Sequence, residues 1–217
     1  MINSWIAADW PAPENVIAGT TLRDGKLEDA KLGGDPCWLE QVHGTDVVLA
    51  KTYESPPVAD ASVSDTANSV CVVRTADCLP VLLCAADGSV VAAAHAGWRG
   101  LAAGVIENAA RKMDVAMGDI LAWLGPAISQ ASFEVGAEVK DAFVAHDSAA
   151  EACFAANARG RWQGDLYALA RLRLAAIGVS SIHGGEFCTY LDKQRFHSYR
   201  RTPDCGRMVS FIASTAP

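Results

Sequence analysis

Residues 89–100 read Ser-Val-Val-Ala-Ala-Ala-His-Ala-Gly-Trp-Arg-Gly. The apolar run predicts a buried β-strand over Val90–Ala94 that delivers His95 at its end. A turn with Trp98-Arg99 between glycines follows, and Leu101–Met113 has the apolar spacing of an amphipathic helix. An imidazole at the end of a rigid strand, beside a tight turn and a helix N-terminus, is well placed to form part of a functional site.

Two other residues of metal-ligand type lie in comparable settings, His43 in Gln-Val-His-Gly and Cys78 in Thr-Ala-Asp-Cys-Leu-Pro. Catalytic zinc sites use three protein ligands and leave the fourth position open, and the long spacings here differ from those of a zinc finger. We therefore predict a metal site made by His43, Cys78 and His95, a ligand set that also accepts copper. The alternative is three unrelated residues: a turn histidine, a buried thiol and a core histidine.

The neighbouring residues suggest chemistry. Asp77 is a candidate general base or a partner that orients an imidazole, and its alternative role is to cap a backbone N–H in a turn. Cys78 with His95 is also a candidate nucleophilic dyad that attacks an acyl carbon. Metal binding and nucleophilic attack are distinguishable, because a metal-bound thiolate is a poor free nucleophile.

Several residues are candidates for anion or ligand binding. Arg99 precedes a helix and is placed to hold an anion with the N-terminal N–H groups, or else faces solvent. Trp98 can stack on a planar ligand or fill a gap between helix and sheet. The sequence Tyr199-Arg200-Arg201 adds aromatic and cationic groups near the C-terminus, and its alternative is a solvated loop.

Composition narrows the class of protein. The chain has 217 residues, 51% of them hydrophobic, which is enough for one globular domain over 1–217. A net charge of −7 argues against general nucleic-acid binding. The sequence shows neither a signal peptide nor a long apolar run, so we expect no membrane span and a cytoplasmic location. The seven scattered cysteines favour reduced thiols, with Cys71 and Cys84 in the core.

In the rest of the chain, groups of predicted strands alternate with predicted helices. Strands are expected at 37–42, 46–50, 70–75, 80–85, 120–124, 181–187 and 208–212. Ala86-Asp87-Gly88-Ser89 predicts a hairpin turn, and helices are expected at 134–143 and 165–177, the second capped by Asp165 and Gly178. Locally paired strands with inserted helices favour an α+β layered domain over a doubly wound parallel sheet.

Several motifs together resemble one family. They are Gln41-Val-His-Gly44, Thr75-Ala-Asp-Cys-Leu-Pro80, His95-Ala-Gly-Trp-Arg-Gly100, Leu124-Gly-Pro-Ala-Ile128, Phe133-Glu-Val-Gly136, Cys188-Thr189, Phe196–Arg201 and Gly206-Arg-Met208. The chain is similar from about Cys37 to Ile212 to the YfiH/YlmD family, described as multicopper polyphenol oxidases or laccase-domain proteins and as purine nucleoside phosphorylases. Two differences stand out: the segment before Gln41 is shorter than usual, and His197 replaces a frequent second aromatic residue.

The resemblance implies a four-layer α/β/β/α sandwich related to the toxin-type cysteine-hydrolase fold, with zinc held by His43, Cys78 and His95. It implies phosphorolysis of adenosine, inosine and methylthioadenosine, with adenosine deamination, so the expected partners are small nucleosides and phosphate. Asp77, Cys78 and Arg99 are then the expected catalytic residues. Arg23, in Thr21-Leu-Arg-Asp-Gly25, joins Trp98, Arg99, Arg200 and Arg201 as expected substrate-binding or anion-binding residues.

Three other functions remain open. A copper-dependent polyphenol oxidase fits the older family description, although the chain has only five histidines for about four coppers. A hydrolase that edits peptidoglycan precursors would use Cys78 with His95, a role also linked to the family. A non-enzymatic partner protein with a residual metal site is the last possibility.

Overall fold

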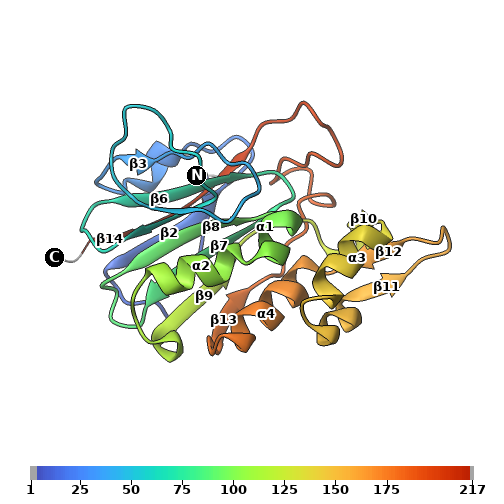
Figure 1. The fold of residues 1–217 in the computed structure, drawn as a ribbon. Coiled ribbons are helices and arrows are strands. Elements are labelled where there is room, and N and C mark those ends of the chain that lie inside the picture. The colour runs from blue at the N-terminus through green and yellow to red at the C-terminus, as the bar shows by residue number, and fades with distance from the viewer. Residues whose placement is uncertain (1–3, 216–217) are drawn as a thin grey trace.

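The structure is a computed structural model that describes residues 4–215. Two β-sheets lie face to face, and helices cover the outer face of the larger sheet (Figure 1). The α+β class predicted from the sequence is confirmed. No helix within the described residues is long and apolar enough to cross a membrane.

The larger sheet has six strands in the order β13-β9-β7-β8-β5-β4. The strands are β4 (Val47–Leu49), β5 (Ala61–Ser64), β7 (Leu79–Ala85), β8 (Val91–Ala96), β9 (Ile120–Leu124) and β13 (Ser181–Gly184). β7 and β8 form the expected hairpin, in which Leu79 pairs with Ala96 and Pro80 pairs with His95. This register places Cys78, one residue before β7, beside the residues that follow His95.

The second sheet has five strands in the order β1-β2-β14-β6-β3. The strands are β1 (Trp5–Ala7), β2 (Val16–Thr21), β3 (Pro36–Cys37), β6 (Val70–Thr75) and β14 (Met208–Ser214). A small third sheet contains β10 (Glu134–Val135), β12 (Trp162–Gly164) and β11 (Phe154–Ala156).

Successive side chains of a strand point to opposite faces of the sheet and so pack into different layers. On β7, Val81 and Leu83 pack against helices, whereas Leu82 and Cys84 pack against the five-stranded sheet. The helices are α1 (Trp98–Ala103), α2 (Val105–Lys112), α3 (Ala137–Val144) and α4 (Leu166–Ala176). The outer face of the five-stranded sheet packs on the short 3-10 helix η1 (Leu27–Ala30), which is the thin fourth layer.

Four predicted elements differ from the structure, and one of them, the strand expected at 181–187, ends at Gly184. The helix expected at 101–113 is broken at Gly104, whose φ of 102° separates α1 from α2. The helix expected from Glu134 begins at Ala137, because Glu134 pairs with Gln163 in the small sheet. The strand expected at 37–42 is limited to β3, since residues 41–44 leave the sheet to form part of the site described next.

Candidate metal centre

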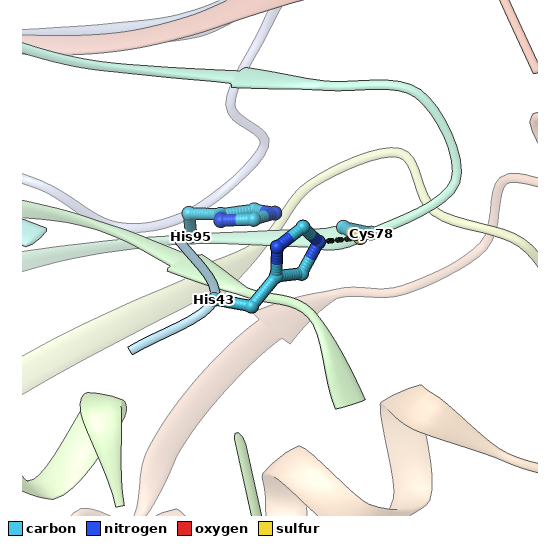
Figure 2. A group of neighbouring side chains, drawn as sticks. All are labelled: His43, Cys78 and His95. Carbon is cyan, nitrogen blue, oxygen red and sulfur yellow. Dashed lines mark hydrogen bonds between the residues drawn. The ribbon is translucent and has the colours of Figure 1, made fainter. Parts of the chain in front are cut away.

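His43, Cys78 and His95 lie together at one edge of the two sheets. Their ligand atoms are all within 4.8 Å of one another, and Cys78 Sγ is 3.8 Å from His43 Nε2. Figure 2 shows the two imidazoles and the thiol turned toward a common point. Three residues that are far apart in the sequence thus form one group, as predicted.

The chain connections explain why the group forms here. Cys78 lies where the chain passes from β6 in the five-stranded sheet to β7 in the six-stranded sheet. His43 lies in a second such crossing, between β3 and β4, and has a left-handed φ of 61°. His95 lies near the C-terminal end of β8 and is buried. Two crossings and one strand end therefore meet at the ligands.

Asp60 ties the two histidines together. Its carboxylate accepts the main-chain N–H groups of Val42, His43 and Gly44 at 3.1, 2.9 and 2.6 Å. The same carboxylate is 2.7 Å from His95 Nδ1, which leaves Nε2 of that ring as the ligand atom. Asp60 is fully buried, and the sequence interpretation missed it, although an acidic residue between apolar neighbours was an available signal.

Gln41 holds the same loop from the other side. Its side-chain amide donates to the Arg74 carbonyl at 2.9 Å, and its Oε1 accepts the Arg74 N–H at 2.8 Å. The pair of bonds resembles one rung of a β-ladder between the loop and β6. The loop that carries His43 is therefore bonded to the five-stranded sheet through Gln41 and β6, and to the six-stranded sheet through Asp60, which precedes β5.

The donor geometry fits a metal ion. For zinc bonds of about 2.0–2.1 Å to nitrogen and about 2.3 Å to sulfur, a tetrahedral site separates S from N by about 3.5 Å, close to the 3.8 Å found between Cys78 and His43. Two imidazole nitrogens and one sulfur suit Zn²⁺, and they also suit copper. Among residues 4–215 this is the single group of three such side chains.

The ionisation of the group favours a thiolate. Burial opposes the charged form of Cys78, but hydrogen bonds and positive charge from His43 and His95 lower the pKa of its thiol to about 6. Burial likewise opposes the charged form of His95, but hydrogen bonds with Asp60 and Cys78 raise its pKa to about 9. Between these values the metal-free protein contains a thiolate beside an imidazolium.

This ionisation predicts the thiol reactivity of the metal-free protein. Because the thiolate is the reactive form, the rate of Cys78 alkylation by iodoacetamide should fall as the pH drops through about 6, not through 9. The stabilisation that the lowered pKa gives the folded state is present above the ordinary thiol pKa of 9.0 and is lost as the pH falls from there to about 6. Cys78→Ala should remove the fast phase, whereas burial raises the pKa of Cys71 to about 12 and keeps it unreactive. A midpoint near 9 for the fast phase would contradict the assignment.

Gly97 and Gly100 allow the His43 loop to approach α1. A Cβ on residue 97 would lie 2.7 Å from His43 Cδ2 and 3.1 Å from Cys78 Sγ. A Cβ on residue 100 would lie 2.8 Å from the Gly44 carbonyl oxygen. All three contacts are closer than a Cβ normally makes, so the glycines of the motif at 95–100 make room for His43 and Cys78.

We expect Gly97→Ala to weaken metal binding. The added methyl group must displace His43 or Cys78, and overpacking of this kind costs about 1–3 kcal/mol, or roughly tenfold to hundredfold in affinity. Competition with a chelator measures the effect. Gly118→Ala is the matched control, because a Cβ there meets nothing within 4 Å. Equal metal affinity in the two variants would show that residue 97 has no such role.

The ligands open into a cavity of about 710 Å³. Besides the three ligands it is lined by Gln41, Arg74, Thr75, Ala76, Tyr199, Cys205 and Arg207. Arg207 reaches this wall because β14 pairs with β6 so that Met208 lies opposite Thr75. Arg74 and Arg207 thus line the same cavity as His43, Cys78 and His95. Arg74 Nη2 also donates to the Leu39 carbonyl, and Arg207 Nη1 donates to the carbonyls of Cys205 and Gly206. Neither arginine was among the predicted anion-binding residues.

Four of the predicted anion-binding or stacking residues lie elsewhere. Arg99 is exposed, with its guanidinium 4.4 Å from the centre of the Trp98 ring, and neither residue lines the cavity. Arg23 donates to the Lys193 carbonyl, and Arg200 donates to the Glu134 carbonyl. The structure therefore does not bring these side chains to the ligands.

Arg201 and Asp77 have their polar atoms engaged by the segment that precedes β14. Arg201 donates to the carbonyls of Thr189, Tyr190 and Phe196. Asp77 Oδ1 accepts from the Thr189 hydroxyl, and Oδ2 accepts from the Ser198 hydroxyl and the Arg200 N–H. Although Asp77 adjoins Cys78, the carboxylate that touches a histidine ligand is that of Asp60.

Comparison with known proteins places this chain in a family. Residues 22–215 match the family described as multi-copper polyphenol oxidoreductase laccase. The chain belongs to this family. The match covers His43, Cys78 and His95 and the cavity residues Arg74 and Arg207. The predicted resemblance is thereby confirmed.

Relatives within the family carry a different name. A Pseudomonas aeruginosa protein named purine nucleoside phosphorylase PA4543 is 44% identical over 97% of this chain and 98% of its own length. The Escherichia coli protein named purine nucleoside phosphorylase YfiH is 45% identical over 95% of this chain and 97% of its own length.

Solved structures share the fold. Neisseria meningitidis protein NMB0706 matches with a TM-score of 0.94 and 42% identity, over 99% of this chain and 100% of that chain. YlmD from Geobacillus stearothermophilus matches with a TM-score of 0.86 and 24% identity, over 100% of this chain and 98% of that chain. The second likeness concerns the fold alone.

Proposed function

We propose that this protein is a zinc-dependent purine nucleoside phosphorylase that acts as a single domain over 1–217. The observation that carries the proposal is the cavity itself, in which a metal-binding group of two histidines and a cysteine is flanked by Arg74 and Arg207. A volume of about 710 Å³ is of the size that holds a nucleoside with phosphate. The names of the relatives from Pseudomonas and Escherichia support the same activity.

The proposed reaction transfers a ribosyl group. A phosphate oxygen forms a bond to C1′ of the ribose, the bond from C1′ to the purine nitrogen breaks, and the purine accepts a proton. Adenosine, inosine and methylthioadenosine are the proposed substrates. Adenosine deamination, in which water replaces the amino group at C6 and ammonia is released, is the proposed second activity.

His43, Cys78 and His95 would hold the zinc ion, and Asp60 would orient His95 toward it. Zinc bound there would supply Lewis-acid polarisation of a substrate and activation of water. Arg74 and Arg207 would bind the phosphate dianion in the same cavity, because guanidinium groups form charge-assisted pairs with phosphate. One group of three ligands suits a mononuclear site better than a site for several coppers.

One observation favours a second candidate, hydrolysis of peptidoglycan precursors by Cys78 and His95. In the metal-free protein the lowered pKa of Cys78 and the raised pKa of His95 describe a thiolate–imidazolium pair, the state of a cysteine nucleophile. Metal content separates the two functions. The hydrolase requires activity without metal, whereas the phosphorylase requires activity that depends on it.

The deciding experiment is chromatography of adenosine and inosine incubated with zinc-loaded protein and phosphate. Purine base with ribose 1-phosphate is expected, together with inosine from adenosine. A His95→Ala control should give none of these products. If the wild-type protein, loaded with one zinc per chain, yields no product, the phosphorylase proposal fails.

Arg207→Gln is expected to raise the KM for phosphate. Loss of a charge-assisted hydrogen bond costs about 1.5–3 kcal/mol, or roughly tenfold to hundredfold, while the zinc content stays at one per chain. Arg111→Gln on α2 is the matched control, because Arg111 is exposed and lies away from this cavity. The same assay on Arg99→Gln decides between the two arginine assignments, since a rise in that variant alone would favour Arg99.

The cysteines bear on where the enzyme works. All seven lie within the described residues and are unpaired. Free thiols and the proposed substrates, nucleoside and phosphate, suit the reducing cytoplasm, where we propose that the enzyme acts.

A further inference from the structure

A long irregular segment connects β13 to β14. Residues 189–207 of this connection, here called the rim segment, supply Tyr199, Cys205 and Arg207 to the cavity wall. In Figure 1 the segment is the orange-red loop beyond β13, at the upper right of the molecule. Long loops without secondary structure in a compact domain are commonly functional.

Asp77 anchors the rim segment to the strand crossing that carries Cys78. The Thr189 hydroxyl donates to Oδ1 at 2.6 Å, and the Ser198 hydroxyl and the Arg200 N–H donate to Oδ2 at 3.0 and 2.7 Å. The carboxylate is buried, and Asp77 has a left-handed φ of 86°, a conformation that a non-glycine residue adopts only where its surroundings fix it. Two of the three bonds are made to the residues on either side of Tyr199.

The rim segment is also bonded within itself. Arg201 donates from its guanidinium to the carbonyls of Thr189, Tyr190 and Phe196, and its N–H donates to the Ser198 hydroxyl. Phe196 is fully buried beneath the segment. The backbone around Tyr199 is therefore held on both sides, while the side chain of Tyr199 is not packed into the core.

Tyr199 is 55% exposed and lines the cavity that contains the three ligands. The Arg207 guanidinium lies over the Tyr199 ring, 5.8 Å from its centre, so the cation covers one face of the ring and the two groups share one wall of the cavity. A planar heterocycle with an anion beside it matches this pair of groups, because bases stack on aromatic rings and guanidinium binds phosphate.

We infer that Tyr199 is the surface on which the purine base stacks, and that Asp77 is the positioning residue that holds Tyr199 in place. The inference rests on the proposed function and specifies how the cavity selects a purine nucleoside. It gives Asp77 a role through the rim segment, in contrast to the general base expected from its place beside Cys78.

Steady-state kinetics with inosine test the role of Tyr199. Tyr199→Leu should raise the KM for inosine by about tenfold to hundredfold, with kcat and zinc content within twofold of wild type. Tyr199→Phe should stay within twofold in KM, since it keeps the ring and loses only the hydroxyl. Tyr190→Leu is the matched control, because Tyr190 is in the rim segment but does not line the cavity. An unchanged KM in Tyr199→Leu overturns the stacking role.

Hydrogen exchange tests the anchor. Asp77→Asn should accelerate amide exchange across 189–201 and raise the KM for inosine, while the zinc content and the pH profile of kcat stay unchanged. A loss of kcat with an altered pH profile and unchanged exchange would instead identify Asp77 as an acid–base residue. If Asp77→Asn does not fold, Thr189→Val and Ser198→Ala each remove one bond and should show smaller effects of the same kind.

The proposed function and the anchoring role of Asp77 can fail independently of each other. If wild-type protein with full zinc neither binds nor converts inosine, the proposed function and the stacking role fall together. The exchange experiment still decides the anchor in that case, because faster exchange in Asp77→Asn supports it and unchanged exchange overturns it.

Discussion

His95→Ala is expected to lose the metal ion and to reduce nucleoside turnover by roughly a thousandfold or more. The substitution removes one of three ligands from a site that has no fourth protein ligand among the described residues. It also leaves the Asp60 carboxylate buried without its imidazole partner, a change that costs about 3–5 kcal/mol. Metal analysis of the purified variant and thermal unfolding measure the two effects.

Cys78→Ala separates loss of the metal ion from loss of stability. It removes a ligand but keeps the pair of Asp60 and His95. Both variants should be free of metal and inactive, but His95→Ala should unfold at the lower temperature when the two metal-free proteins are compared. Full zinc occupancy in His95→Ala would exclude this histidine as a ligand.

Asp60→Asn should give the second large effect. The asparagine places an NH₂ group where the carboxylate now accepts three main-chain N–H groups and His95 Nδ1. His43 and His95 then lose their common anchor, so metal affinity should fall by about tenfold to hundredfold. Chelator competition measures the fall, and the exposed Asp35→Asn should show none.

The pKa of Asp60 adds a pH dependence to this prediction. Burial raises that pKa, but hydrogen bonds from His95, Gly44 and Val42 outweigh burial and lower it. The stabilisation by the ionised carboxylate is therefore present at neutral pH and is lost as the pH falls through the lowered pKa. Asp60→Asn should abolish this part of the acid sensitivity. An identical acid profile in wild type and variant would contradict the role of Asp60.

Local signals predicted much of the fold. The apolar runs of β7, β8 and β9, the Asp87-Gly88 turn and the N-cap of α4 at Asp165 are all present. β2 and β5 were missed because Val16–Thr21 contains glycine and two threonines and Ala61–Ser64 is short with two serines. These strands form because both of their neighbours in the sheet pair with them, a constraint that no local window contains.

Sequence reasoning could predict those site residues whose side-chain type alone indicates a function, such as metal binding. Histidine and cysteine at strand ends indicated a metal site at His43, Cys78 and His95, and the family resemblance implied zinc at the same three positions. Asp60 offered only its position between apolar neighbours as a signal, and the role of Arg207 could not be read locally, because both roles depend on partners far along the chain. Asp60 acts through residues 42–44 and His95, and Arg207 reaches the cavity only through the pairing of β14 with β6.

The two strand crossings that carry His43 and Cys78 have a mechanical consequence. Each crossing joins the five-stranded sheet to the six-stranded sheet, and His95 belongs to the larger sheet. An ion bound by all three residues would act as a cross-link at the edge of the interface between the sheets. Binding to the folded state alone stabilises that state, so zinc would strengthen the contact between the two halves of the sandwich as well as complete the site.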